Sequence, residues 1–263
     1  EGAGSWVFPP PPHAARATSF AFDPIDPSIL YVTVEVGGVM KSEDGGESWR
    51  PLTTDVNRDT HDILVNPEDP ETLYVSTGFG STHQPGVYRS LNRGETWEHC
   101  YGNMFPIYTL RMCIDPQQTN VLHAIAYPYA PGDWHNPPGT GGMLVRTEDG
   151  AKTWTKPHAG VHLPTVNYIP MLRPDPEAPG GVFFAISPYL PPTKAPINGT
   201  PERFYNDDGY NPPLPYVDLG GDIHPSVDPP AQETRIIRSG PNGESWEVIA
   251  SGLPPVQDFL VLN

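Results

Sequence analysis

The chain has 263 residues, and 31 acidic against 15 basic residues give it a formal net charge of −16. This acidic balance disfavours nucleic acid and anionic membrane surfaces as partners, and it favours cations or neutral polar ligands. No apolar run approaches the roughly 20 residues of a membrane span, and two cysteines define no disulfide framework. The 26 glycines and 36 prolines are interleaved with short apolar runs, which predicts many short strands instead of helices.

Four blocks along the chain share one plan, in which an apolar strand, an Asp/Asn-Pro turn and a second apolar strand follow one another. The blocks are FAFDPIDPSILYV at 20–32, ILVNPEDPETLYV at 63–75, MCIDPQQTNVLHA at 112–124 and MLRPDPEAPGGVFFA at 171–185. Proline fixes φ at the start of the turn, and the Asp or Asn side chain can hydrogen-bond the turn backbone. Each block therefore predicts an antiparallel hairpin.

Each block is followed by a third short strand, a glycine-containing segment that ends in tryptophan, and a fourth strand. The tryptophan segments are KSEDGGESW at 41–49, RSLNRGETW at 89–97, RTEDGAKTW at 146–154 and RSGPNGESW at 238–246. Their Asp can cap turn amides, their Gly can take a positive φ, and their Trp can pack between neighbouring sheets. Substitutions within the frame, by Asn92, Ala151 and Pro241, favour a structural turn over four copies of a catalytic group.

Four antiparallel strands in a repeat of about 46–57 residues are typical of a β-propeller blade. We therefore predict an all-β fold, a β-propeller of four-stranded antiparallel blades, as a single domain over residues 1–263. The visible repeats span about 14–53, 59–100, 107–157 and 166–250, with part-blades at 1–13 and 251–263. The fourth repeat carries a long Pro-rich insertion in 187–231.

The tryptophan segments resemble Asp-box (BNR) repeats, as in sialidases, sortilin-type receptors, photosystem II assembly factors and oligoxyloglucan-active glycoside hydrolases. This resemblance covers nearly the whole chain and implies the propeller fold, which serves many unrelated functions. The stretch LYVTVEVGGVMKS at 30–42 also resembles the first-blade segment of the oligoxyloglucan-active hydrolases, where an Asp-Val-Gly-Gly carries a catalytic acid. Glu35 occupies the matching place. Those enzymes place a second acid in a second propeller, so their mechanism is not transferred to this chain.

The strand order sorts the connecting loops onto two ends of the sheets. The Asp/Asn-Pro turns and the tryptophan segments lie at one end, and the loops after each second strand and between repeats lie at the other. The irregular segments, 53–61, 76–86, 99–108, 126–142, 155–168 and 187–233, all fall at the second end. Irregular loops on a rigid scaffold are where binding groups collect, which predicts a polar funnel opposite the tryptophan segments.

Glu35 follows the second strand of the first repeat, and Asp59 and His61 begin the next inner strand. Adjacent blades would bring Glu35 and His61 together, and a carboxylate beside an imidazole is a workable acid/base pair. The candidate catalytic residues are therefore Glu35, His61 and Asp59. The alternative is that the pair is a hydrogen-bonded fastener between neighbouring blades.

Other polar and aromatic side chains are expected at the same mouth, where arginine suits a carboxylate or phosphate and tyrosine suits stacking against a ring. The candidate substrate-binding residues are Arg16, Asp62, Tyr108, Arg111, His135, Tyr168, Tyr205 and Asp207, the last two from a segment at 203–210 that is a candidate lid. No H-x-x-x-H or H-E-x-x-H spacing marks a metal site, so no metal ligand is assigned and the sequence requires no cofactor.

These features predict a protein that binds a small polar molecule or glycan, with hydrolase or lyase chemistry carried by Glu35 and His61. Two alternatives remain open, a non-catalytic protein- or peptide-binding or assembly module, and an enzyme dependent on a divalent metal held by His61. The substrate, the compartment and the oligomeric state do not follow from the sequence.

Overall fold

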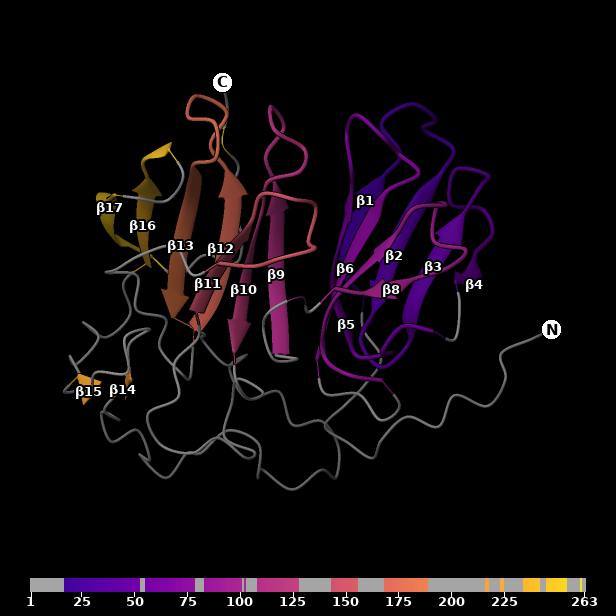
Figure 1. Cartoon of the computed structure of the whole chain (residues 1–263), viewed down its shortest axis with the longest axis horizontal. Coiled ribbons are helices and arrows are strands. Elements are labelled where there is room, and N and C mark those ends of the chain that lie inside the picture. The colour runs from indigo at the N-terminus through magenta and orange to yellow at the C-terminus, as the bar shows by residue number, and fades with distance from the viewer. Residues whose placement is uncertain are drawn as a thin grey trace.

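The computed structural model describes residues 17–52, 55–78, 83–100, 102, 108–127, 143–155, 168–188, 216–217, 223–224, 234–241, 245–254 and 261. These residues form no α-helix, and their strands build four main antiparallel sheets that follow one another across the molecule (Figure 1). The predicted all-β fold of four-stranded antiparallel sheets is confirmed. None of the described segments forms a helix that could cross a membrane.

The first two sheets each contain four strands in chain order. The first sheet comprises β1 (Ala17–Phe22), β2 (Leu30–Val34), β3 (Gly38–Ser42) and β4 (Arg50–Leu52). The second comprises β5 (Thr60–Val65), β6 (Leu73–Thr77), β7 (Gly86–Ser90) and β8 (Glu98–His99). Leu30 pairs with Ser42 in the first sheet as Leu73 pairs with Ser90 in the second, so both sheets repeat one register.

The third and fourth sheets depart from this plan. The third comprises β9 (Tyr108–Ile114), β10 (Leu122–Tyr127) and β11 (Met143–Thr147), and the fourth comprises β12 (Tyr168–Pro174), β13 (Val182–Pro188), β16 (Thr234–Ser239) and β17 (Trp246–Leu253). In the third sheet, the described part of the predicted fourth strand is one bridge between Arg146 and Thr155. A small pair, β14 (Tyr216–Val217) and β15 (Ile223–His224), lies between β13 and β16 in the chain. Most of the Pro-rich insertion falls outside the described residues, and the extent of the domain and its part-blades remains a prediction.

The Asp/Asn-Pro turns join the first two strands of each sheet. In the first turn, the amides of Ile25 and Asp26 donate to Asp23 Oδ1 at 2.9 and 3.0 Å. Asn66 and Asp115 accept two amides in the same way in the next two turns. A short polar side chain at the end of each first strand thus replaces lost backbone partners and fixes where the hairpin begins.

The tryptophan segments form the turn between the third and fourth strands. In the first of them, Ser42 Oγ donates to Asp44, which also accepts the amide of Ser48 at 2.9 Å, while the amide of Gly46 donates to Ser42 Oγ at 2.8 Å. Hydrogen bonds from Ser48 and Ser42 lower the pKa of Asp44 to about 2. The acid in this turn is therefore occupied by its own backbone and hydroxyl neighbours.

Apolar side chains pack between consecutive sheets and form the core. The cluster between the first and second sheets includes Tyr31, Val39, Ile63 and Val75, all at most 3% exposed. Two further clusters lie between the second and third sheets and between the third and fourth sheets. The second and third sheets thus bury both faces against neighbouring sheets, and the inner strands β1, β5, β9 and β12 lie side by side.

Candidate functional site

The candidate site lies where the inner strands β5 and β9 begin, at the end of the sheets opposite the Asp/Asn-Pro turns. Asp59 precedes β5 directly, and Tyr108 is the first residue of β9. Counted back from the Asn or Asp of their turns, Asn66 and Asp115, these two residues hold equivalent positions in the repeat. Neighbouring blades therefore deliver a carboxylate and a phenol to the same place.

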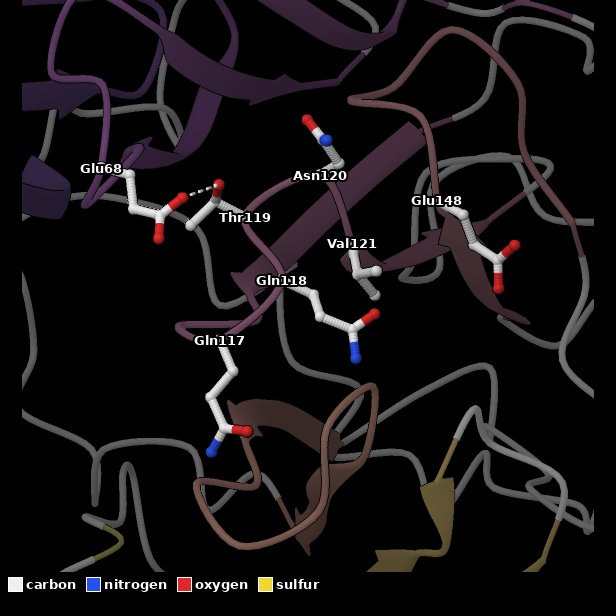
Figure 2. Close-up of a pocket in the computed structure, with 7 residues that line it drawn as sticks. All are labelled: Glu68, Gln117, Gln118, Thr119, Asn120, Val121 and Glu148. Atoms are coloured by element: carbon white, nitrogen blue, oxygen red, sulfur yellow. Dashed lines mark hydrogen bonds between the residues drawn. The ribbon is translucent and has the colours of Figure 1, made fainter.

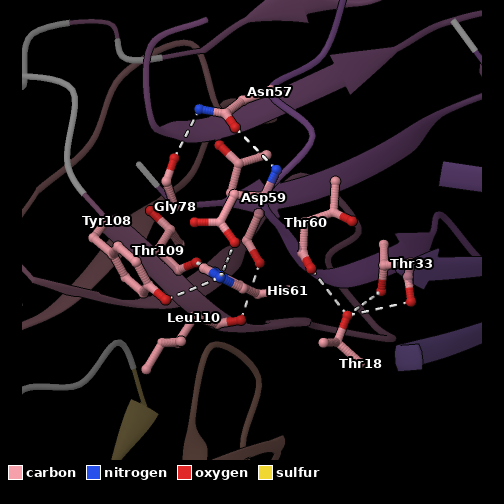
Figure 3. Close-up of polar contacts among 12 residues, drawn as sticks. Thr18, Thr33, Asn57, Asp59, Thr60, His61, Gly78, Tyr108, Thr109 and Leu110 are labelled. Atoms are coloured by element: carbon pink, nitrogen blue, oxygen red, sulfur yellow. Dashed lines mark hydrogen bonds and ion pairs between the residues drawn. The ribbon is translucent and has the colours of Figure 1, made fainter. Parts of the chain in front are cut away.

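His61 lies between them on β5, and its side chain is 6% exposed. Its Nδ1 is 2.8 Å from the carbonyl oxygen of Thr109 (Figure 3). Because a carbonyl only accepts, Nδ1 carries a proton, and Nε2 is the nitrogen left to accept or exchange one. Nε2 lies 3.0 Å from the hydroxyl of Tyr108 and 3.3 Å from Oδ1 of Asp59.

Asp59 is held by the loop that precedes β5. Its amide donates to Asn57 Oδ1 at 3.0 Å, and its carbonyl accepts the amide of Gly78 at 2.7 Å. Asn57 in turn donates to the carbonyl of Gly78 at 2.8 Å (Figure 3). The loop and the end of β6 are thereby tied into one support beneath the carboxylate.

Gly78 leaves room for the side chains of Asp59, His61 and Tyr108, because it has no side chain of its own. A Cβ at this position would lie 2.2 Å from Asp59 Oδ2, 2.5 Å from Tyr108 Cε2 and 2.6 Å from His61 Cε1. All three distances are well inside van der Waals contact, so a residue with any side chain would displace these groups. Gly78 follows Leu73 by the same five residues that separate Glu35 from Leu30, so glycine replaces a long side chain at this point of the second repeat.

Glu35 completes the cluster from the turn after β2. One oxygen of Glu35, one oxygen of Asp59 and one nitrogen of His61 all lie within 4.8 Å of one another. Glu35 and Asp59 are partly exposed, whereas His61 is buried. The arrangement offers two carboxylates and an oriented imidazole to a ligand, which is a set suited to proton transfer or to holding a cation.

Asp62 and Arg111 lie deeper and tie strands together. The Asp62 carboxylate accepts hydrogen bonds from Ser19 on β1 and from the amide of Met112 on β9, at 2.5 and 2.9 Å. Burial raises the pKa of this carboxyl, while Arg111 beside it lowers the pKa. Arg111 Nη1 donates to the carbonyl oxygens of Thr18 and His61 at 3.2 and 3.4 Å. Both groups thus fasten three inner strands, and their substrate-binding role stays a prediction.

Of the residues that the sequence singled out, the structure brings together Glu35, Asp59, His61 and Tyr108. Their proposed roles remain predictions, as do those of the other candidates. Arg16, His135, Tyr205 and Asp207 lie outside the described residues, and Tyr168 is described only as the backbone of β12. Sequence reasoning missed Gly78, Asn57 and the carbonyl of Thr109, although aligning the repeats on Leu30 and Leu73 would have marked Gly78 as the counterpart of Glu35.

A hollow of about 490 Å³ lies at the opposite end of the sheets, among the Asp/Asn-Pro turns (Figure 2). It is lined by Glu68, Gln117, Gln118, Thr119, Asn120, Val121 and Glu148. Thr119 donates to Glu68 at 3.1 Å, a contact that joins the turns of the second and third sheets. Among the described residues, this lining offers two carboxylates, Glu68 and Glu148, but no imidazole or phenol like those of the Glu35 cluster.

The fold is that of a β-propeller, and sequence comparison relates it to enzymes with this fold. No protein-family model matches the chain. It is 26% identical over 171 residues to xyloglucanase Xgh74A of Acetivibrio thermocellus, an alignment that covers 56% of this chain and 18% of that enzyme. It is 25% identical over 146 residues to a probable oligoxyloglucan-reducing end-specific xyloglucanase of Neosartorya fischeri, covering 52% and 17%. The matched region is thus less than a fifth of the length of these relatives.

Solved structures give the same relation at the level of the fold. The GH74 xyloglucanase of Xanthomonas campestris superposes with a TM-score of 0.54 at 13% identity, over 88% of this chain and 29% of that one. An ancestral GH74 enzyme gives a TM-score of 0.51 at 17% identity, over 80% and 26%. The chain is therefore a propeller similar to xyloglucanases in sequence and in architecture, and Asp-box membership remains a resemblance.

Proposed function

We propose that this chain forms part of a carbohydrate-active β-propeller, which binds a glycan at the Glu35–Asp59–His61–Tyr108 cluster and transfers protons there in a hydrolase or lyase reaction. The observation that carries the proposal is the convergence of Glu35, Asp59 and His61 within 4.8 Å of one another at the end of the inner strands. Its support from comparison is the sequence similarity to xyloglucanases.

The imidazole of His61 is set up to exchange a proton through Nε2. The carbonyl of Thr109 fixes the proton on Nδ1, and the Tyr108 hydroxyl lies 3.0 Å from Nε2. Histidine is the side chain whose charge changes most readily near neutral pH, and a phenol in contact with it can pass or receive a proton. Tyr108 and His61 together therefore supply a path by which a proton reaches or leaves the bound glycan.

We assign different roles to the two carboxylates, Glu35 and Asp59. Glu35 and Asp59 approach within 4.8 Å, which is closer than the roughly 6.5–9.5 Å of the acid and base in an inverting glycosidase. They are therefore not an inverting pair, and we assign Asp59, 3.3 Å from Nε2, to stabilising the charge that His61 gains when Nε2 takes up a proton. Glu35, which is partly exposed, is assigned to contact the substrate as the second acid/base group.

The test is turnover by the full chain and its Glu35→Gln, His61→Ala and Glu68→Gln variants, the last as a matched control in the hollow among the Asp/Asn-Pro turns. Xyloglucan oligosaccharides, other β-glucans and uronic-acid polysaccharides are supplied, and new reducing ends are separated from new unsaturated ends to distinguish hydrolysis from elimination. Loss of a general acid or base lowers kcat by about 10²–10⁴-fold. We expect this for Glu35→Gln and His61→Ala, with Glu68→Gln unchanged.

Two results would count against the proposal. If Glu35→Gln and His61→Ala instead lose several kcal/mol of unfolding free energy, the cluster is a fastener between blades. If the full chain binds glycans without turning any over, and both variants bind as well as the parent chain, the cluster is neither catalytic nor the binding site.

A further inference from the structure

We infer that Glu35, Asp59 and His61 form a binding site for a divalent transition-metal ion, with Zn²⁺ and Mn²⁺ as the ions that fit best. The inference concerns the side chains of the proposed function but does not rest on turnover, and an ion bound at His61 Nε2 would replace the proton that the proposed function exchanges there. Three atoms that are at most 4.8 Å apart all lie within about 2.8 Å of one common point, which is close to metal–ligand distances of about 2.0–2.3 Å. Small side-chain rotations would complete the coordination.

The hydrogen bonding of His61 matches that of a metal-binding histidine. Metal-binding histidines almost always donate their second ring N–H to a carbonyl or carboxylate, which turns the free nitrogen toward the ion. His61 donates from Nδ1 to the carbonyl of Thr109 at 2.8 Å, and its Nε2 lies 3.3 Å from Asp59 and 3.0 Å from the Tyr108 hydroxyl. An ion at Nε2 would take the place of that hydroxyl. The histidine is 94% buried, so its direction is set by packing before any ion arrives.

The surroundings match the charge of the ion. Two carboxylates and a neutral imidazole carry a formal charge of −2, which a divalent cation cancels, and carboxylates this close repel each other without one. The whole chain is acidic, with a net charge of −16, which attracts cations toward the site. Gly78 leaves the space for this arrangement, because a Cβ there would lie 2.2 Å from Asp59 Oδ2.

The donor set selects the class of ion. Imidazole suits Zn²⁺, Fe²⁺, Ni²⁺ and Cu²⁺, whereas Mg²⁺ and Ca²⁺ prefer oxygen ligands alone. Carboxylates also suit Mn²⁺, so one nitrogen with two carboxylate oxygens fits Zn²⁺ or Mn²⁺ better than Mg²⁺. Three protein ligands also leave coordination positions open, which is the pattern of catalytic metal sites and would allow a glycan hydroxyl or a water molecule to bind.

The site is tested by titrating metal-stripped full chain with Zn²⁺, Mn²⁺ and Mg²⁺ in a calorimeter, and with Co²⁺ followed by its visible absorption. We expect one equivalent of Zn²⁺ or Mn²⁺ to bind. Each of the variants Glu35→Gln, Asp59→Asn and His61→Ala should bind at least about tenfold more weakly, since even losing an outer-shell partner typically costs 10–100-fold. Glu68→Gln should match the parent chain.

Folding of every variant is checked by its thermal midpoint, and Asp59→Asn, which keeps size and shape, serves if His61→Ala fails to fold. No stoichiometric binding, equal affinity in all four variants, or tighter binding of Mg²⁺ than of Zn²⁺ would each overturn the inference. Metal binding without turnover would defeat the proposed function and leave the site standing. Turnover that survives chelation, in a chain that binds no metal, would overturn the metal site and leave the proposed function standing.

Discussion

Replacing Gly78 with alanine changes the candidate site by a single methyl group. Gly78 does not have a positive φ, so alanine fits the backbone there and the change acts only through the space that Cβ occupies. That Cβ would meet Asp59 Oδ2, Tyr108 Cε2 and His61 Cε1 at 2.2, 2.5 and 2.6 Å. All three atoms are far ends of side chains, so we expect these side chains to rotate away while the strands stay in place.

The expected cost in unfolding free energy is about 1–3 kcal/mol, the usual range for an extra methyl in a packed region. The same rotation separates the groups that must converge, and because a misplacement of about 1 Å can cost about 100-fold in rate, turnover should fall by about that factor and Zn²⁺ affinity should fall with it. A suitable control is Gly45→Ala, because Gly45 has φ +74° and no atom within 4 Å of the added Cβ. Its left-handed backbone costs about 1–2 kcal/mol with alanine, and the cluster is untouched.

Chemical denaturation, glycan turnover and metal titration are measured for both variants side by side. If both variants lose similar stability but only Gly78→Ala loses turnover and metal affinity, the site depends on the space at Gly78. If Gly78→Ala keeps full stability and full metal affinity or turnover, then the three side chains do not converge as described, and the reasoning is wrong.

Three further predictions concern the scaffold. Asp62→Ala should lower the unfolding free energy by about 2–4 kcal/mol in urea denaturation, because Ser19 on β1 and the buried amide of Met112 on β9 lose their acceptor. Asp44 and Asp149 have pKa values lowered to about 2, Asp44 mainly by Ser48 and Asp149 by Thr153 against the opposing effect of burial. Their stabilisation is complete above about pH 4 and is lost as the pH falls toward 2, so replacing both with Asn should flatten the dependence of the melting temperature on pH in that range. Burial raises the pKa of the Cys100 thiol to about 11 and also raises the pKa of Cys113, so both should be alkylated slowly at pH 8 until denaturant is added.

Each of these has a result that would contradict it. An Asp62→Ala variant as stable as one changed at the exposed Glu247 would show that the carboxylate fastens nothing. An unchanged pH profile in the double Asn variant would place the acid sensitivity elsewhere. Alkylation of native thiols as fast as of unfolded ones would mean that neither cysteine is buried in solution.

The fold could be predicted because its signals are local and repeated. Asp23, Asn66 and Asp115 each accept amides two or three residues ahead, so a turn is specified within a few residues whatever the rest of the chain does. The third sheet contains a contact that such local turn signals do not specify. Trp154 is 3% exposed and donates to the carbonyl of Cys100 at 2.9 Å, and beyond it the described chain adds one bridge at Thr155. This contact joins residues 54 positions apart in the chain, a separation that no local turn pattern specifies.

The site could be predicted only in part because it is not local. The sequence indicated that Glu35 and His61 would meet, since they follow and begin strands of adjacent repeats. It did not indicate that the Thr109 carbonyl fixes the His61 tautomer, because a backbone group has no residue signature. Nor did it mark Asn57, whose side chain ties the loop before β5 to Gly78 at 2.8 Å.

The contrast between the two ends of the sheets explains how a repeated scaffold holds a single site. At the turn end, equivalent positions keep equivalent chemistry: Ser42–Asp44 and Ser90–Asn92 make the same hydrogen bonds in their turns. At the other end, equivalent positions differ, with Glu35 against Gly78 after the second strands and Asp59 against Tyr108 where the first strands begin. A carboxylate from one blade can meet a carboxylate, an imidazole and a phenol from the next two only because the middle blade contributes a glycine where its neighbour has a glutamate. Restoring the repeat, by Gly78→Glu, would place a second long acid in the same space, and it should abolish both proposed activities of the cluster while the turns at the opposite end keep their hydrogen bonds.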